Sequence, residues 1–334
     1  SNHNSMQSPS VSVIVPIYKT ERFIKRCLQS LFEQTLSDIE YIFVNDCTPD
    51  KSMEILSEVL NTSYSHKKPQ VKIVSHDKNR GASVARNSGL SAATGQYVIF
   101  ADSDDWVKQD AYAMMYEKAV KHDYDIIWSD YYINESETET YKSQYFNPCK
   151  TDCIRALLSG SMHGGPWNKL VRRNLYTDHG ISFTDGLLIW EDMTVNIKLF
   201  YVSNRIGYLS EGCYHYVRYN ADSITQSCNG TFRTQHMIHG TEEIDRFLSA
   251  QNDLGLFEKE LSYRKLFAKA GLLVSSDKEI AEQWRLQFPE SHKYILSAPM
   301  FSFRFKVLQW TVAHDWWLIY KIYNWLNTHR RRFH

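Results

Sequence analysis

Three carboxylates follow an apolar stretch of the chain within four residues. The segment Val98–Trp106 reads VIFADSDDW, and it places Asp102, Asp104 and Asp105 at the end of an expected buried strand. Like charges this close repel one another, so a shielded site needs a cation or several hydrogen-bond donors to compensate them. Because all-oxygen ligand sets favour Mg²⁺ or Mn²⁺, the spacing of Asp102 and Asp104 predicts a metal site with open positions for substrate phosphates. The alternative is a solvated acidic turn that caps the next helix.

Two arginines stand around a glycine in the segment DKNRGASVARNSG. Arg80 precedes Gly81, where we expect a helix to begin, and Arg86 follows within that helix. Free backbone amides at a helix start, together with guanidinium groups, suit a diphosphate. A metal on one side and arginines on the other would neutralise a nucleotide diphosphate as it leaves. For Arg86, an ion pair inside the domain is the alternative, so Arg80 is the better candidate for ligand contact.

The elements that must position these residues alternate between strand and helix. Apolar, β-rich runs predict strands over residues 11–18, 39–46, 71–75 and 96–102, and helical spacing predicts helices over residues 21–35, 50–60 and 82–94. This alternation predicts a parallel sheet with helices on both faces. Ligands gather at the carboxyl ends of such strands. Tyr18, Asp46 and Asp102 stand at these ends and should converge on one crevice.

Composition excludes several classes of protein. The 334 residues are 43% hydrophobic and 23% charged, which is typical of a globular protein, and 38 basic residues balance 38 acidic ones, so no global field indicates nucleic acid. The six cysteines form no zinc pattern, and their scatter suits reduced thiols rather than a disulfide framework. The first ten residues contain no basic region followed by an apolar one, so we expect no secretory signal and a cytoplasmic location.

In this order, the motifs resemble the family 2 glycosyltransferases of the GT-A fold. The resemblance is carried by VSVIVPIYKTERFIKRCLQSLFEQTLSDIEYIFVNDCTPDKS, NRGASVARNSGLSAATGQYVIFADSDDW and LLIWEDMTVNIKL, and it covers about the first two thirds of the chain. It implies a Rossmann-like, mostly parallel sheet flanked by helices, followed by a helical C-terminal region. It also implies inverting transfer of a sugar from a nucleotide-sugar donor, most often a UDP-sugar, to a glycan or lipid-linked acceptor, in the synthesis of a surface polysaccharide or related glycan.

The resemblance assigns the donor site residue by residue. The loop near the base and ribose would contain Pro16, Tyr18 and Glu21. Asp46 would hold the uracil, and Arg80 would contact the diphosphate or the uracil side. Asp102, Ser103 and Asp104 match the DXD metal motif, with Asp104 as the direct ligand of Mn²⁺ or Mg²⁺.

The segment IWEDMTVNIKLF supplies the second pair of carboxylates. Glu191 and Asp192 stand at the start of an apolar-periodic helix, where negative charge is also favourable for the helix dipole alone. The resemblance makes Asp192 the general base that deprotonates the acceptor hydroxyl, with Glu191 in support. A sugar hydroxyl is a weak nucleophile, so a carboxylate within hydrogen-bond reach answers a chemical need.

Two further segments are candidates for the acceptor side. HGGPWNKLVRRN places Trp167, Asn168 and Lys169 in an expected flexible loop, where Trp167 could stack on a sugar or pack as a core tryptophan instead. In YHYVRYNADSIT, His215 or Arg218 could reach the diphosphate or the metal. A satisfied structural histidine is the alternative for His215.

We expect a GT-A domain over residues 10–225, with a donor half at about 10–130 and an acceptor half at about 131–225, and a helical region over 226–334. In its last segment, Trp316, Ile319, Tyr323 and Leu326 follow helical spacing. The polar residues His314, Asp315 and Lys321 interrupt the run, which excludes a membrane span. This helix could lie peripherally on the anionic inner face of a membrane, helped by Arg330, Arg331 and Arg332. Alternatively, its aromatic residues pack on the helices around 235–275 or on a second subunit of a homo-oligomer.

Two other classes of protein stay open. A metal-dependent nucleotidyltransferase would need a glycine-bearing phosphate loop near the first strand, and PIYKTERF has no glycine. A non-catalytic nucleotide-sugar or glycan-binding protein of the same fold would be favoured by loss of the acidic motifs, and these motifs are intact.

Overall fold

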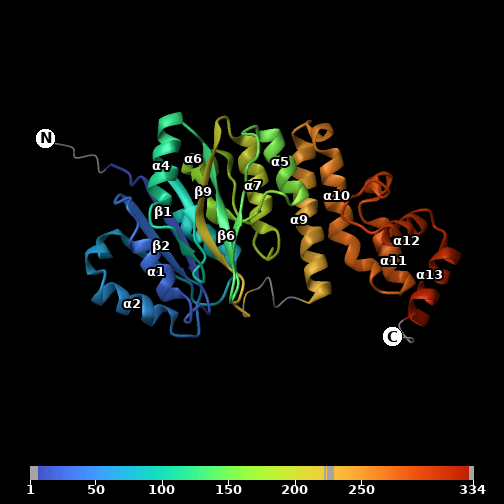
Figure 1. The fold of residues 1–334 in the computed structure, drawn as a ribbon, viewed down its shortest axis with the longest axis horizontal. Helices are drawn as coiled ribbons and strands as arrows, with labels where there is room; N and C mark the ends of the chain where they lie inside the picture. The colour runs from blue at the N-terminus through green and yellow to red at the C-terminus, as the bar shows by residue number, and fades with distance from the viewer. Residues whose placement is uncertain (1–6, 222, 224–228, 331–334) are drawn as a thin grey trace. The chain divides into compact units, whose positions relative to one another are not determined.

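The chain divides into two compact units, Ser1–Ser227 and Cys228–His334 (Figure 1). The computed structural model describes residues 7–221, 223 and 229–330. Strands and helices alternate through the first unit, whereas the secondary structure described in the second unit is helical.

The first unit is a sheet with helices packed on it. Its strands are β1 (Val11–Ile17), β2 (Ile39–Asn45), β3 (Val71–Ser75), β4 (Tyr97–Phe100), β5 (Trp106–Val107), β6 (Ile126–Asn134), β7 (Glu139–Lys142), β8 (Lys169–Arg172) and β9 (Ile206–Val217). Its helices are α1 (Ile24–Phe32), α2 (Ser52–Thr62), α3 (Ala82–Ala92), α4 (Ala111–His122), α5 (Lys150–Ser159), α6 (Arg173–His179) and α7 (Glu191–Val202), with 3₁₀ turns η1 (Ser65–Gln70) and η2 (Pro166–Asn168). The strands and helices expected before Asp102 are therefore confirmed.

Within the described residues, nine strands form one sheet in the order β3-β2-β1-β4-β8-β6-β9-β5, with β7 paired to β6. The strands β3, β2, β1 and β4 are mutually parallel. β8 runs antiparallel to β4 and β6, whereas β6 and β9 are parallel. The expected α/β fold, with a sheet flanked by helices and a helical C-terminal region, is confirmed, and the structure adds antiparallel strands after β4.

Helices cover both faces of β1, and this is why its sequence is apolar at nearly every position. Val13 and Val15 belong to a core cluster that includes side chains of α1 and α4. Ile14 points to the opposite face, where a Cβ added to Gly89 of α3 would lie 2.2 Å from Ile14 Cγ2. Such burial on both faces is typical of parallel sheets. Since β1, β2 and β4 are parallel, their carboxyl ends lie at one edge.

The second unit has its own small core. Its helices are α9 (Gly230–Ala250), α10 (Glu258–Lys269), α11 (Lys278–Leu286), α12 (Phe303–Ala313) and α13 (Trp317–Arg330), with 3₁₀ turns η3 (Leu254–Leu256), η4 (Ala270–Leu273) and η5 (Pro289–Tyr294). Trp284 is fully buried there, with His292 stacked on it and the Nζ of Lys269 4.0 Å from its ring centroid. The core also contains Leu308, Val312 and Tyr320, so α12 and α13 are part of it.

The cysteines Cys27, Cys47, Cys149, Cys153 and Cys213 are free thiols, and Cys228 lies outside the described residues. In the part of the chain that the structure describes, no helix combines the length and the apolarity needed to cross a membrane.

Candidate active site

The acidic turn after β4 separates its three aspartates by environment. Asp105 is buried, and its carboxylate accepts hydrogen bonds from the Tyr214 hydroxyl at 2.6 Å and the Val217 amide at 2.8 Å. The same Tyr214 hydroxyl accepts a hydrogen bond from the backbone amide of Asp102 at 2.9 Å. Asp102 and Asp104 are only partly buried. Asp105 therefore holds the turn in place, and the other two carboxylates stay available to a ligand.

The remaining pair fits a divalent cation. One carboxylate oxygen from each of the three aspartates can be chosen so that all lie within 4.8 Å of one another. Burial, and next the charge of Asp102, raise the pKa of Asp104 to about 6. The Nδ2 of Asn220, after β9, donates to Asp104 at 3.1 Å. Hard oxygen ligands of this kind suit Mg²⁺ or Mn²⁺.

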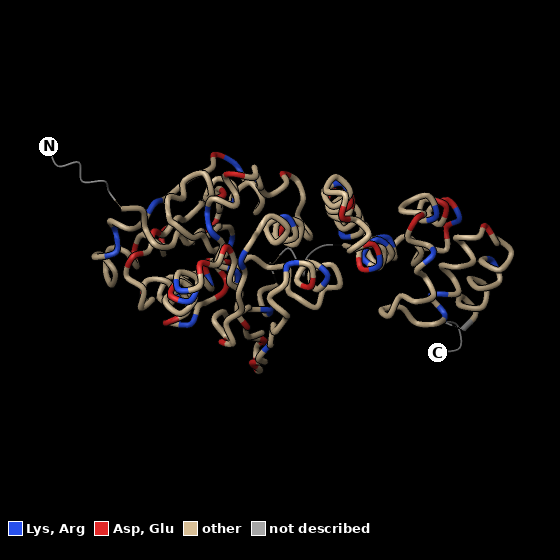
Figure 2. The backbone as a smooth tube through the Cα atoms, turned by 90° about the horizontal axis from the view of Figure 1, so that it is seen from above, with Lys and Arg blue, Asp and Glu red and all other residues tan. Residues whose placement is uncertain are grey.

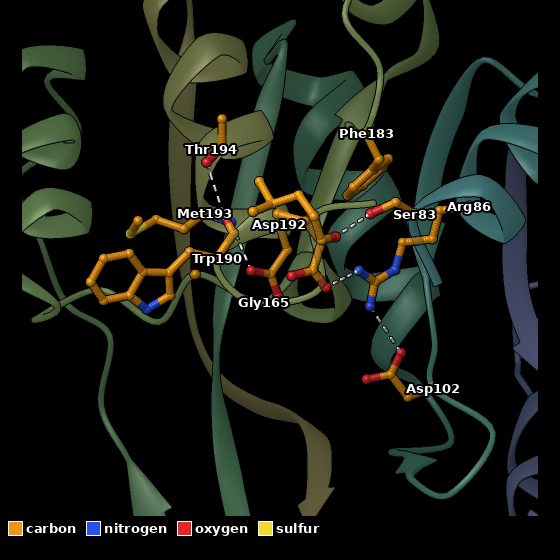
Figure 3. Close-up of polar contacts among 12 residues, drawn as sticks. Ser83, Arg86, Asp102, Gly165, Phe183, Trp190, Asp192, Met193 and Thr194 are labelled. Atoms are coloured by element: carbon orange, nitrogen blue, oxygen red, sulfur yellow. Dashed lines mark hydrogen bonds and ion pairs between the residues drawn. The ribbon is translucent and has the colours of Figure 1, made fainter. Parts of the chain in front are cut away.

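Arg86 of α3 links this turn to the start of α7. Its guanidinium lies 3.0 Å from the Glu191 carboxylate and 3.5 Å from the Asp102 carboxylate (Figure 3). The ring of Phe183 lies 5.4 Å from the guanidinium carbon. Only 7% of the Arg86 side chain is exposed. Arg86 therefore forms ion pairs inside the domain, which was the alternative to contact with a diphosphate.

Asp192 follows Glu191 in the first turn of α7. Burial, and next the charge of Glu191, raise the pKa of Asp192 to about 7, while Arg86 acts in the opposite direction. Its Oδ1 accepts a hydrogen bond from the Met193 amide at 2.7 Å. A carboxylate with a pKa near neutrality is suited to accept and release a proton.

The residue before this pair has an unusual backbone conformation. Trp190 has φ 64° and ψ 14°, a left-handed conformation that is uncommon for a bulky residue. Its carbonyl accepts hydrogen bonds from the amide and the hydroxyl of Thr194, and its indole points away from Arg86 (Figure 3). Strained residues of this kind cluster at functional sites, where the surrounding structure maintains them. No sequence pattern predicted this conformation.

The donor candidates lie at the carboxyl ends of β1 and β2 and before α3. Tyr18 is 39% exposed, and Arg80 is exposed. Asp46 is buried, and its carboxylate accepts hydrogen bonds from the amides of Arg80 at 2.8 Å and Gly81 at 2.9 Å and pairs with His76 Nδ1 at 2.8 Å. Two amides expected to face a diphosphate therefore donate to Asp46, which holds the loop that carries Arg80.

The other donor candidates join neighbouring loops. Glu21 is exposed and its carboxylate accepts a hydrogen bond from the Lys51 amide at 3.0 Å. The Ser103 hydroxyl lies 2.8 Å from that of Thr20 and is buried. Pro16 is partly buried within β1. The Ser103 contact ties the acidic turn to the loop after β1.

The segment expected as a flexible acceptor loop is instead part of the core. Trp167 is 3% exposed and stacks on Tyr214 with ring centroids 4.5 Å apart, so it packs as a core tryptophan. Lys169 begins β8 and is buried, with its Nζ donating to the carbonyls of His163 at 2.7 Å and Gly165 at 2.8 Å and to Asn168 Oδ1 at 2.9 Å. Burial lowers the pKa of Lys169 to about 7. The expectation of a flexible loop is therefore wrong, because Trp167 packs against Tyr214, whose hydroxyl donates to Asp105.

The Nδ1 atom of His215 contacts Asn134 and not the acidic turn. Its ring is stacked between Trp106 and Tyr132, and its Nδ1 lies 2.9 Å from Asn134 Oδ1. Burial lowers its pKa to about 4. These contacts match the structural role that was its alternative. Arg218 is exposed, and its amide donates to the Asn134 carbonyl; residues 222 and 224–228 of this loop lie outside the described residues.

Comparison with known proteins identifies the family. The model of glycosyl transferase family 2 matches residues 12–180. EpsH of Bacillus subtilis (strain 168) is 32% identical over 268 residues, which cover 77% of this chain and 74% of EpsH. The chain belongs to glycosyl transferase family 2. EpsJ of the same organism, an uncharacterized glycosyltransferase, is 35% identical over 225 residues, which cover 65% of this chain and only 63% of EpsJ.

A solved structure shares the fold of this family 2 chain. Residues 1–349 of TarS from S. aureus, in complex with UDP-GlcNAc, align with a TM-score of 0.70 and 21% sequence identity. The alignment covers 91% of this chain and 87% of the TarS chain. The GT-A fold expected from the motifs is therefore confirmed.

Proposed function

We propose that the first unit is a metal-dependent, inverting glycosyltransferase that moves a sugar from a UDP-sugar to a hydroxyl of a glycan or lipid-linked acceptor, in surface polysaccharide synthesis. The observation that carries the proposal is the position of Arg86. Its guanidinium pairs with Asp102 in the acidic turn and with Glu191, which directly precedes Asp192. One internal ion-pair network therefore joins the donor-side carboxylates to the proposed base.

The donor is proposed to lie along the carboxyl ends of β1 and β2. Tyr18 and Arg80 offer exposed side chains there, and Pro16 and Glu21 flank the same loop. Asp46 acts through the loop it holds, since its oxygens already accept two amides. The UDP-GlcNAc complex of the structurally similar TarS supports a UDP-sugar as donor.

Asp104 and Asp102 are proposed to hold Mn²⁺ or Mg²⁺ beside the diphosphate. Such an ion, when bound, neutralises charge that develops on the leaving diphosphate. Asp105 and Tyr214 keep the turn rigid through their hydrogen bond, so the two ligands are preorganised. Asn220 orients Asp104 through its amide group.

Asp192 is proposed to take the proton from the attacking acceptor hydroxyl. In its deprotonated form it serves as general base, and the new bond forms on the face of the sugar opposite the departing UDP. An α-linked donor would therefore give a β-linked product. Glu191 is positioned through its ion pair with Arg86 and supports Asp192 from the adjacent position.

Calorimetry with UDP and Mn²⁺ tests the metal assignment. We expect Asp104→Asn to abolish the increase in UDP affinity that Mn²⁺ produces, because it removes a ligand charge. Asp178→Asn, an exposed aspartate on α6, is the matched control and should bind as the wild type does. Unchanged Mn²⁺-dependent affinity in Asp104→Asn would place the ion elsewhere.

A further inference from the structure

One exposed side of α13 presents large apolar residues. Leu318 is 73% exposed, Trp325 59%, Ile322 50% and Leu326 49%. At 100° per residue these positions gather on one side of the helix. Tyr320, on the other side, is 2% exposed and belongs to the core of the second unit.

This arrangement is the reverse of an ordinary surface helix, which presents polar residues to water. Two further apolar side chains of this segment are exposed: Phe303 at the start of α12 is 78% exposed, and Trp316 in the turn before α13 is 48% exposed. Large apolar side chains that gather exposed on one side of a helix mark a candidate interaction site.

The charges of the same segment have one dominant sign. Between residues 296 and 330 the only acidic residue is Asp315, whereas the basic residues are Arg304, Lys306, Lys321 and Arg330. Over the chain as a whole, acidic and basic residues are interspersed (Figure 2). Arg304 and Lys321 are exposed. Asp315 is engaged by the indole nitrogen of Trp317. The segment therefore combines exposed aromatic and aliphatic side chains with the exposed cations Arg304 and Lys321.

We propose that α13, together with the start of α12, docks on the surface of an anionic lipid bilayer. Leu318, Ile322 and Trp325 would enter the interface between headgroups and acyl chains, with Arg304 and Lys321 at the anionic headgroups. In this position the helix lies along the surface, because Tyr320 on its other side packs in the core of the second unit.

The charges favour a bilayer over a second copy of the chain. A two-fold symmetric dimer through this face would bring the same patch of each subunit together, so two surfaces of like net charge would meet. An anionic surface instead satisfies both the apolar and the basic groups. The proposal goes beyond the proposed function and does not depend on it.

Co-sedimentation of the full chain with vesicles tests the docking. We expect binding to vesicles of phosphatidylcholine with 30% phosphatidylglycerol, weaker binding at high salt, and little binding to pure phosphatidylcholine. In the double variant Leu318→Gln/Trp325→Gln, the affinity for the anionic vesicles should fall by about tenfold or more. Lys321→Gln should reduce binding about fivefold, the effect of one cation near such a surface.

A matched double variant separates docking from general loss of apolar surface. Val274 and Leu286 are 83% and 65% exposed on other parts of the second unit, so Val274→Gln/Leu286→Gln should bind vesicles as the wild type does. The UDP affinity of every variant is also measured. This measurement distinguishes a loss of vesicle binding from a failure of the proposed donor site. Equal vesicle binding by Leu318→Gln/Trp325→Gln and the wild type would overturn the proposal. So would absence of vesicle binding together with wild-type self-association that the same variant abolishes, which would assign the face to a second copy.

Discussion

Replacing Arg86 with methionine should change both stability and the pH dependence of transfer. The variant keeps most of the side-chain volume and removes the cation that Glu191 and Asp102 share. Glu191 is left buried, with 11% of its side chain exposed, whereas Asp102 is 31% exposed and partly hydrated. Removing one partner of a buried ion pair costs about 3–5 kcal/mol, and because Asp102 is partly solvated we expect about 3 kcal/mol.

The effect on pH dependence follows from the charge of Arg86. Asp192 must be deprotonated to act as base, so the rate falls as the pH drops through its pKa of about 7. Arg86 opposes the rise of that pKa, so its removal raises the pKa further. The acidic limb of the rate profile should therefore move to higher pH.

Release of UDP from a UDP-sugar, measured from pH 5 to 9, and urea unfolding provide the two readouts. Arg86→Lys retains the charge and should keep the acidic limb near that of the wild type. Arg172→Met removes another partly buried arginine, paired with Asp123 and Asp125, and should cost stability without moving the limb. An acidic limb that stays in place in Arg86→Met would refute the coupling between Arg86 and the base.

Two further substitutions test the framework of the site. Tyr214→Phe removes a donor to the buried Asp105, and we expect a loss of about 1–3 kcal/mol in urea unfolding together with weaker Mn²⁺-dependent UDP affinity; wild-type Mn²⁺ dependence would contradict the positioning role. Gly89→Ala introduces a Cβ 2.2 Å from Ile14 Cγ2 and should cost about 1–3 kcal/mol, whereas Gly230→Ala, which meets nothing within 4 Å, should cost nothing measurable in the same melts.

The sequence predicts the donor half of the fold because its signals are local. Residues 11–18 form a short, β-rich apolar run that is typical of a strand buried on both faces, and β1 occupies Val11–Ile17. The antiparallel strands β8 and β9 depend on long-range pairing, which apolar periodicity does not reveal.

Within the site, residue types could be predicted but not their directions. The pattern DSDD identifies an acidic turn, yet only packing against Tyr214 decides that Asp105 is buried whereas Asp104 is partly exposed. Likewise, helical spacing cannot say whether Arg86 meets a ligand or Glu191, because its partner is 105 residues away in the chain.

The C-terminal segment illustrates the same limit. Tyr323 packs against the core of the second unit, whereas Trp316, Ile319 and Leu326, which share its helical spacing, are exposed. Periodicity defines a face of a helix but not whether that face meets a core or another surface. Arg331 and Arg332 lie outside the described residues, and the docking face rests on α12 and α13.

Asp192→Asn tests the assignment of Asp192 as the general base. The variant keeps the shape of the side chain but cannot take a proton, so UDP affinity should persist while transfer falls by about 10² to 10⁴. Asp178→Asn again serves as the matched control, and NMR of the wild-type product should give a β-linkage from an α-linked donor. Full transfer activity in Asp192→Asn, or a product that retains the α configuration, would contradict an inverting transferase with Asp192 as its base.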